Sequence, residues 1–157
     1  MSFWKKKKQS DVNKPVVNPG LKNAFKKFYL NRSETTLQVL SNEINTATFL
    51  VLINTAEMNY TKSDESGKVT VEKGSKIKFL NTFDEHNNPF LPVFTDWAEI
   101  DLWLKSREGV AGWMMTVDDI FAVVRSSNYS GLVINLCTDK WQMTKDQIDI
   151  FIKETKN

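Results

Sequence analysis

The stretch from Leu91 to Leu136 constrains the fold more than any other part of this chain. Short apolar runs alternate there with two segments that carry helix signals. Chains with this alternation lay strands side by side and pack helices across them. The stretch therefore predicts an α/β (α+β) domain built on a β-sheet, and it indicates no particular reaction.

Helix starts are well marked in the second half of the sequence. The spacing of reciprocal helix capping occurs at three places: Asp96 with Glu99, Thr116 with Asp119, and Thr144 with Gln147. We expect one helix over Asp96–Ser106 and two more that begin at Thr116 and Thr144. The apolar runs Ala111–Met115 and Gly131–Leu136, which lie between these helices, predict strands.

The first half predicts two helices and a central strand. Asn18-Pro19 has the pattern of a helix N-cap followed by proline at the first helical position. A second helix is expected over Ser33–Ile44, with its apolar residues on one side. The branched apolar run Ala47–Ile53 predicts a strand that is buried on both faces and therefore central in the sheet.

A long polar loop separates this strand from a predicted hairpin. The loop covers residues 54–76 and includes a short edge strand at Val69–Val71. The runs Ile77–Phe83 and Phe90–Thr95 then pair through the turn-rich connector Asp84–Asn88. Strands separated by helices tend to be parallel, whereas a hairpin is antiparallel. We therefore expect a mixed sheet of about five strands, with two N-terminal helices, the central hairpin and a C-terminal β-α-β-α-β-α run.

The charge distribution divides the chain into a basic tail and one folded domain. Residues 1–17 have few groups to bury, so we expect a flexible tail there and a single domain over residues 18–155. Met1–Arg32 holds nine lysines and arginines against Asp11 alone, a formal charge of +8, so the rest of this +2 chain carries −6. The tail contains four adjacent lysines, Lys5, Lys6, Lys7 and Lys8. They predict at most a weak attraction to an anionic surface and no specific binding of nucleic acid.

Residue counts exclude several kinds of chemistry. Cys137 and His86 are the only residues of their types, which rules out intrachain disulfides, Cys/His zinc cages and cysteine-held iron–sulfur clusters. We expect His86 to be solvated in its turn, Cys137 to be a buried and inert thiol, and no cofactor or metal to be needed. The sequence contains no nucleophile elbow, phosphate-binding loop or dinucleotide fingerprint. It therefore predicts no catalytic residues.

Four segments carry a family resemblance: Asn18-Pro19-Gly20-Leu21, Ala47 before the first strand, Leu91-Pro92-Val93-Phe94-Thr95-Asp96, and Gly131-Leu132-Val133-Ile134-Asn135. They resemble the N-terminal domain of the SseB family, of the enhanced serine sensitivity type, over roughly Asn18 to Lys153. That family usually follows the asparagine with proline, where this chain has Leu136. The resemblance implies an α/β domain, sometimes followed by a second domain, and it implies no established biochemical activity.

Five residues are candidates for a ligand or partner surface. Thr95, Asp96 and Asn135 follow predicted strands, and ligands of open α/β sheets collect at the carboxyl ends of strands. The alternative, which we favour, is that Asp96 only caps a helix and Asn135 only satisfies backbone groups. Trp113 and Trp141 flank predicted loops, where they could form an exposed aromatic patch of the kind that partners use.

These observations lead to two expectations about function. The first is a non-enzymatic cytoplasmic module that binds a protein partner through the two tryptophans and the strand-end polar residues. The second is a small-metabolite-binding domain or enzyme with a polar pocket formed by Thr95, Asp96 and Asn135 and at least one perturbed carboxylate. No apolar run reaches about 18 residues and no secretory signal pattern is present, so we expect no transmembrane segment.

Overall fold

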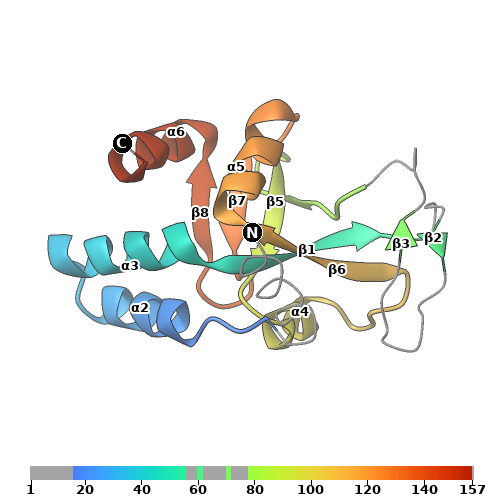
Figure 1. The fold of residues 1–157 in the computed structure, drawn as a ribbon, viewed down its shortest axis with the longest axis horizontal. Coiled ribbons are helices and arrows are strands. Elements are labelled where there is room, and N and C mark those ends of the chain that lie inside the picture. The colour runs from blue at the N-terminus through green and yellow to red at the C-terminus, as the bar shows by residue number, and fades with distance from the viewer. Residues whose placement is uncertain (1–15, 56–59, 62–69, 72–77, 157) are drawn as a thin grey trace, which may run out of the picture.

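The computed structural model describes residues 16–55, 60–61, 70–71 and 78–156 (Figure 1). Nearly all of the predicted tail over residues 1–17 and most of the predicted loop over residues 54–76 lie outside these residues. The described chain combines helices with a mixed sheet, which confirms the predicted fold class.

The elements follow the predicted order closely. Within the described residues, the helices are α2 (Pro19–Leu30), α3 (Glu34–Thr46), α4 (Trp97–Trp103), α5 (Val117–Ser126) and α6 (Lys145–Thr155). The strands there are β1 (Thr48–Asn54), β2 (Tyr60–Thr61), β3 (Thr70–Val71), β4 (Thr82–Phe83), β5 (Pro89–Phe94), β6 (Val110–Thr116), β7 (Gly131–Ile134) and β8 (Trp141–Thr144).

The main sheet has the strand order β6-β1-β5-β7-β8, with β4 paired to β5. β1 is antiparallel to both of its neighbours, β5 and β7 are parallel, and β7 and β8 are antiparallel. The five inner residues of β1 are all buried, so this strand is central, as its continuous apolar run predicts. β2 and β3 form a separate two-stranded hairpin.

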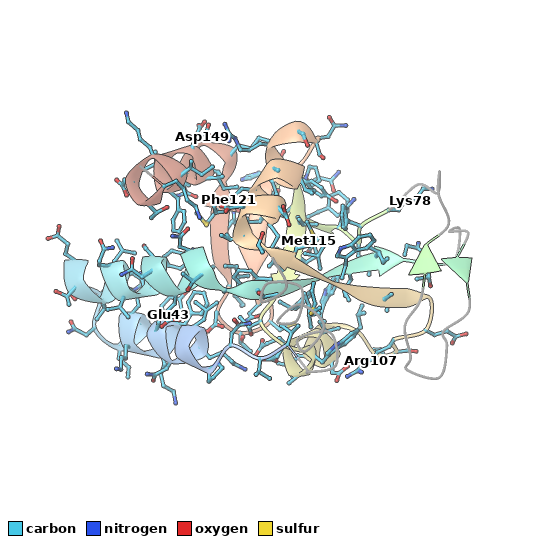
Figure 2. The ribbon with its side chains drawn as sticks, viewed as in Figure 1. Glu43, Lys78, Arg107, Met115, Phe121 and Asp149 are labelled. Atoms are coloured by element: carbon cyan, nitrogen blue, oxygen red, sulfur yellow. The ribbon has the colours of Figure 1, made fainter. Side chains whose placement is uncertain are left out.

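Helices cover both faces of the sheet (Figure 1). The larger hydrophobic core lies on the face covered by α5 and α6, and buried residues of α2 and α3 such as Phe25 and Leu40 belong to it as well. The smaller core lies on the other face, where Ile100 of α4 packs with Leu50, Leu52 and Phe94. Figure 2 shows Arg107 beside α4, away from Phe121 of α5 and Asp149 of α6. Burying both sheet faces in this way is the usual means of stabilising an α/β domain.

The predicted helix caps are confirmed to different degrees. Thr144 and Gln147 bond reciprocally, and so do Ser33 and Thr36 at the start of α3. The side chains of Asp96 and Thr116 accept the predicted bonds at the starts of α4 and α5, but the reciprocal bonds from Glu99 and Asp119 are absent. Asn18 makes no side-chain cap bond to α2. Its amide instead donates to the carbonyl oxygens of Thr48, at 2.9 Å, and Thr95, at 2.8 Å.

Two features of the sheet differ from the predicted arrangement. β6, which follows α4, does not lie next to β5 but pairs antiparallel with the far side of β1. The predicted C-terminal run also omits β8, a four-residue edge strand whose Trp141 and Met143 pack against the larger core. So short a strand carries too little alternating pattern to be distinguished from a loop. The predicted hairpin is present, although β4 is only two residues long.

Candidate functional site

Polar side chains from two separate segments meet where β5 and β7 end. Thr95 directly follows β5, Asp96 caps α4, and Asn135 directly follows β7. β5 and β7 are parallel neighbours, so their carboxyl ends lie at the same edge of the sheet. Thr95 and Asn135 are completely buried and Asp96 is 9% exposed. The three candidate residues are therefore brought together, as open α/β topology leads one to expect.

Asn135 holds this junction through both ends of its amide. Its Oδ1 accepts from the Thr95 backbone N–H at 3.1 Å, and its Nδ2 donates to Thr95 Oγ1 at 3.0 Å and to Asp139 Oδ2 at 2.7 Å. The residue has φ of 51°, in the left-handed region that asparagine tolerates better than most side chains. Its carbonyl accepts from the backbone N–H groups of Thr138 and Lys140, which closes the turn between β7 and β8.

The Asp96 carboxylate and one further carboxylate, that of Glu99, meet one ammonium group beside this junction. Lys22 of α2 donates to Asp96 Oδ2 at 3.1 Å and to Glu99 Oε2 at 3.3 Å. Glu99, which is only 6% exposed, also accepts from Thr138 Oγ1 at 2.6 Å. Because these contacts engage the Glu99 carboxylate, it does not return to the cap of α4. We call Lys22, Thr95, Asp96, Glu99, Asn135 and Asp139 the strand-end cluster.

An open hollow of about 450 Å³ lies directly against the strand-end cluster. Its lining comes from α2, α4 and the turn between β7 and β8: Lys22, Asn23, Lys26, Glu99, Thr138 and Asp139. Thr95 and Asn135 lie behind this lining, fully buried. The hollow therefore exposes Lys22, Glu99 and Asp139, and not Asp96 or the buried Thr95 hydroxyl and Asn135 amide.

A family model for the SseB protein N-terminal domain matches residues 21–149, which includes the whole strand-end cluster. The chain belongs to the SseB family. No curated protein and no solved structure matches the chain. The family match confirms the resemblance carried by the segments that end at Asp96 and Asn135.

The electrostatics of this SseB domain single out Asp139. Burial raises the pKa of the Asp139 carboxyl, and the charges of Glu99 and Asp96 raise it further, while the Asn135 hydrogen bond and the charge of Lys22 lower it. Burial lowers the pKa of Lys22, but the hydrogen bonds and charges of Asp96 and Glu99 outweigh that effect and leave it above the ordinary value. Three carboxylates thus share the charge of one lysine.

The two candidate tryptophans do not join the SseB strand-end cluster. Trp113 lies on β6 and Trp141 on β8, at opposite edges of the main sheet. Trp113 is 36% exposed. Trp141 is half-buried, and its ring lies 5.9 Å from that of Phe25 and 5.6 Å from that of Phe28, centroid to centroid. A single aromatic patch containing both tryptophans is therefore not formed in this fold.

His86 and Cys137, the single histidine and the single cysteine, do not line the hollow. His86 is exposed in the turn after β4, as predicted, with Nε2 at 3.5 Å from Glu85 Oε1. Cys137 is exposed, contrary to the prediction of a buried thiol, because β7 ends at Ile134 and Cys137 lies in the following turn. In the part of the SseB domain that the structure describes, no three His, Cys, Asp or Glu side chains are grouped to hold a metal ion. Across the same residues, no helix has the length and apolar character needed to cross a bilayer.

Lys22, Glu99, Thr138 and Asp139 are site residues of the SseB domain that sequence reasoning missed. Glu99 has the spacing of a capping partner, which conceals its bonds to Lys22 and Thr138. Lys22 is one of several lysines on α2, and nothing in the sequence distinguishes it from Lys26. Thr138 and Asp139 belong to a turn whose shape depends on the position of β8.

Proposed function

We propose that this SseB domain is a non-enzymatic binding module, and that its hollow receives a cationic group from a partner, such as the side chain of a lysine or arginine. The observation that carries this proposal is the charge balance at the strand-end cluster. Asp96, Glu99 and Asp139 converge there, and only Lys22 pairs with any of them among the described residues. A cation that enters the hollow would supply the missing charge beside Asp139.

The hydrogen bonding and the raised pKa of Asp139 support a cation as the ligand. Its carboxylate accepts from the Asn135 amide, and in the described residues it has no ion pair of its own. Burial and two neighbouring carboxylates hold its pKa above the ordinary value, so the ionised form is poorly compensated in the free protein. An ammonium or guanidinium donates to a carboxylate more strongly than a neutral group does.

The shape of the site supports a partner's side chain as the source of the cation. The hollow is open to solvent, 41% of the Lys22 side chain is accessible, and Thr138 is exposed. Such a site admits the end of a side chain from a neighbouring surface without requiring a lid. Lys26 lies on the same lining, one helical turn from Lys22, and its positive charge weakens the attraction.

The hydrogen bonding of the cluster supports binding in preference to catalysis. The Thr95 hydroxyl, the Asp96 carboxylate and the Asn135 amide all bond to one another or to the backbone. A nucleophile or general base needs a reactive atom that a substrate can approach. In the strand-end cluster, the polar atoms of Thr95, Asp96 and Asn135 are occupied by the bonds that connect the ends of β5 and β7 and cap α4.

The proposal is tested by NMR titration of the full chain with N-acetyl-lysine methylamide at neutral pH. The backbone amide signals of Thr138 and Asp139 should shift in a saturable manner. Asp139→Asn should weaken binding about tenfold, the order expected for the loss of one charged hydrogen bond. Lys26→Gln should strengthen it about twofold, since it removes a nearby like charge.

The anionic probe N-acetyl-glutamate methylamide provides the matched control. It should not bind, because the strand-end cluster against the hollow has three carboxylates and one lysine. If the anionic probe binds and Lys26→Gln weakens it, the hollow is an anion site and the proposal is wrong. If neither probe shifts the two amide signals, the hollow is not a ligand site for charged groups.

A further inference from the structure

β6 forms an edge of the sheet with an unusual composition. All seven of its residues pair with β1, and no strand of the described chain pairs with its other side. The strand has the sequence Val-Ala-Gly-Trp-Met-Met-Thr, without a charged residue or a proline. Natural edge strands commonly carry lysine, proline or a bulge that prevents pairing with another chain. β6 contains neither of these residue types, and its register with β1 is continuous.

The outward direction of the β6 peptide groups follows from one hydrogen bond. The Thr55 backbone N–H donates to Gly109 O at 2.9 Å, and these two residues lie opposite each other when the β1–β6 register is extended by one position. Bonded and non-bonded pairs alternate along an antiparallel ladder. Ala111, Trp113 and Met115 therefore bond to β1. The residues that direct N–H and C=O groups away from β1 are Val110, Gly112, Met114 and Thr116. The Val110 N–H already donates to Arg107 O at 3.2 Å, and the carbonyl of Thr116 accepts the first bond of α5, so Gly112 and Met114 are the two that present both groups.

The peptide groups of Gly112 and Met114, with the Val110 carbonyl and the Thr116 N–H on either side, suit another extended strand as their partner. We infer that this strand is β6 of a second copy of the chain, paired antiparallel about a two-fold axis at Trp113. In that register Gly112 lies opposite Met114 of the second copy, and Val110 lies opposite Thr116. Every outward-directed residue then faces another outward-directed residue, which is the match that hydrogen bonding across a two-fold axis requires.

The side chains of β6 favour self-pairing in the same register. No like charges meet, because the strand contains no charge, whereas a charged edge residue would often oppose a charge on the second copy. Trp113 would face its own copy in a non-bonded pair, where cross-strand side chains approach most closely. Trp113 and Met114 are 36% and 39% exposed in the single chain, so both have surface left to bury. The opposite edge, β8, has four residues and leads directly into α6.

This inference concerns a surface that contains none of the lining residues of the hollow, so it does not depend on the proposed function. Sedimentation velocity of the full chain from micromolar to millimolar concentration should show the average mass rising toward that of a dimer. Trp113→Lys places two like charges opposite each other and should raise the dimer dissociation constant at least about tenfold. Leu102→Lys changes an exposed leucine of α4, 61% accessible, and should leave the constant unchanged.

Cysteine cross-linking tests the register itself and does not depend on the stability of Trp113→Lys. In a Cys137→Ser background, Trp113→Cys should form an intermolecular disulfide under mild oxidation, because facing Cα atoms at a non-bonded pair lie about 4.5 Å apart. Ala111→Cys should not, since it faces Met115 of the second copy. A chain that stays monomeric at millimolar concentration would overturn the inference. Cross-linking of Ala111→Cys as efficient as that of Trp113→Cys would overturn it as well.

Discussion

Lys22 is the residue on which the strand-end cluster depends most. It is the ammonium that pairs with the nearly buried carboxylates of Asp96 and Glu99. Leaving a buried charge without its partner costs far more than a solvent-exposed ion pair contributes. Because 41% of the Lys22 side chain is exposed, water screens part of this interaction and lowers the cost.

Lys22→Met should therefore lower the free energy of unfolding by about 1–3 kcal/mol at neutral pH. The pKa of Lys22 is raised in the folded state, so the lysine contributes its full stability below the ordinary value of 10.5. That contribution is lost as pH rises through the higher folded-state pKa. Urea unfolding at neutral pH and at pH values above 10.5 measures both effects.

Lys27→Met on the same helix is the matched control, because Lys27 is exposed and does not line the hollow. It should change the free energy of unfolding by less than about 0.5 kcal/mol. If the two variants lose equal stability, the contacts of Lys22 with Asp96 and Glu99 do not support the fold.

For single residues, the sequence predicted which side chains belong to the site better than it predicted their hydrogen-bond and ion-pair partners. Thr95, Asp96 and Asn135 were identifiable because strand ends carry the polar groups of open α/β sheets. Their contacts with Lys22 and Asp139 were not, since both depend on how α2 and the turn after β7 pack against the sheet. Side chains brought together from distant segments leave no periodic signal in the sequence.

At the level of elements, the absence of a side chain at Gly112 allows β6 to pack closely against α4 on the side of the smaller core. A Cβ atom at this position would lie 2.6 Å from Cζ2 of Trp97, in the first turn of α4. The guanidinium of Arg107 lies over the Trp97 ring, 4.3 Å from its centroid, and Arg107 in turn bonds to Asp101. The indole therefore has little room to move away.

Gly112→Ala should lower the free energy of unfolding by about 1–3 kcal/mol, the usual cost of overpacking a well-filled site. Gly20→Ala is the control, because its Cβ would meet only the flexible end of Glu43. Chemical unfolding of both variants makes the comparison. Equal and small losses would show that Trp97 is not held as tightly as its contacts indicate.

The length of an element and the presence of a capping residue explain which elements could be predicted. Long elements with capping residues, such as α5 and α6, were predicted from their first residue onward because caps and apolar periodicity agree there. β8 has four residues and no such signal. The position of β6 beside β1 was also missed, since sequence pattern does not show which strands are neighbours.

For the whole molecule, the fold separates two kinds of surface. The polar surface lies at the ends of β5 and β7, against α2 and α4, and the apolar one is the edge of β6 that no described strand pairs with. The alternation of apolar runs with helix signals predicted a mixed α/β domain, and the counts of cysteine and histidine excluded several metal and redox sites. Only the arrangement of α2 against the sheet creates the hollow beside the strand-end cluster, in which Lys22 meets Asp96 and Glu99.

The titration of the Asp139 side chain by NMR tests the proposed cation site most directly. In the free protein its pKa should lie above the ordinary carboxyl value, because the group is partly buried beside two carboxylates. Saturation with N-acetyl-lysine methylamide should lower that pKa, since a bound ammonium favours the ionised form. A pKa at the ordinary value in the free protein, or one that the bound probe leaves unchanged, would contradict the account.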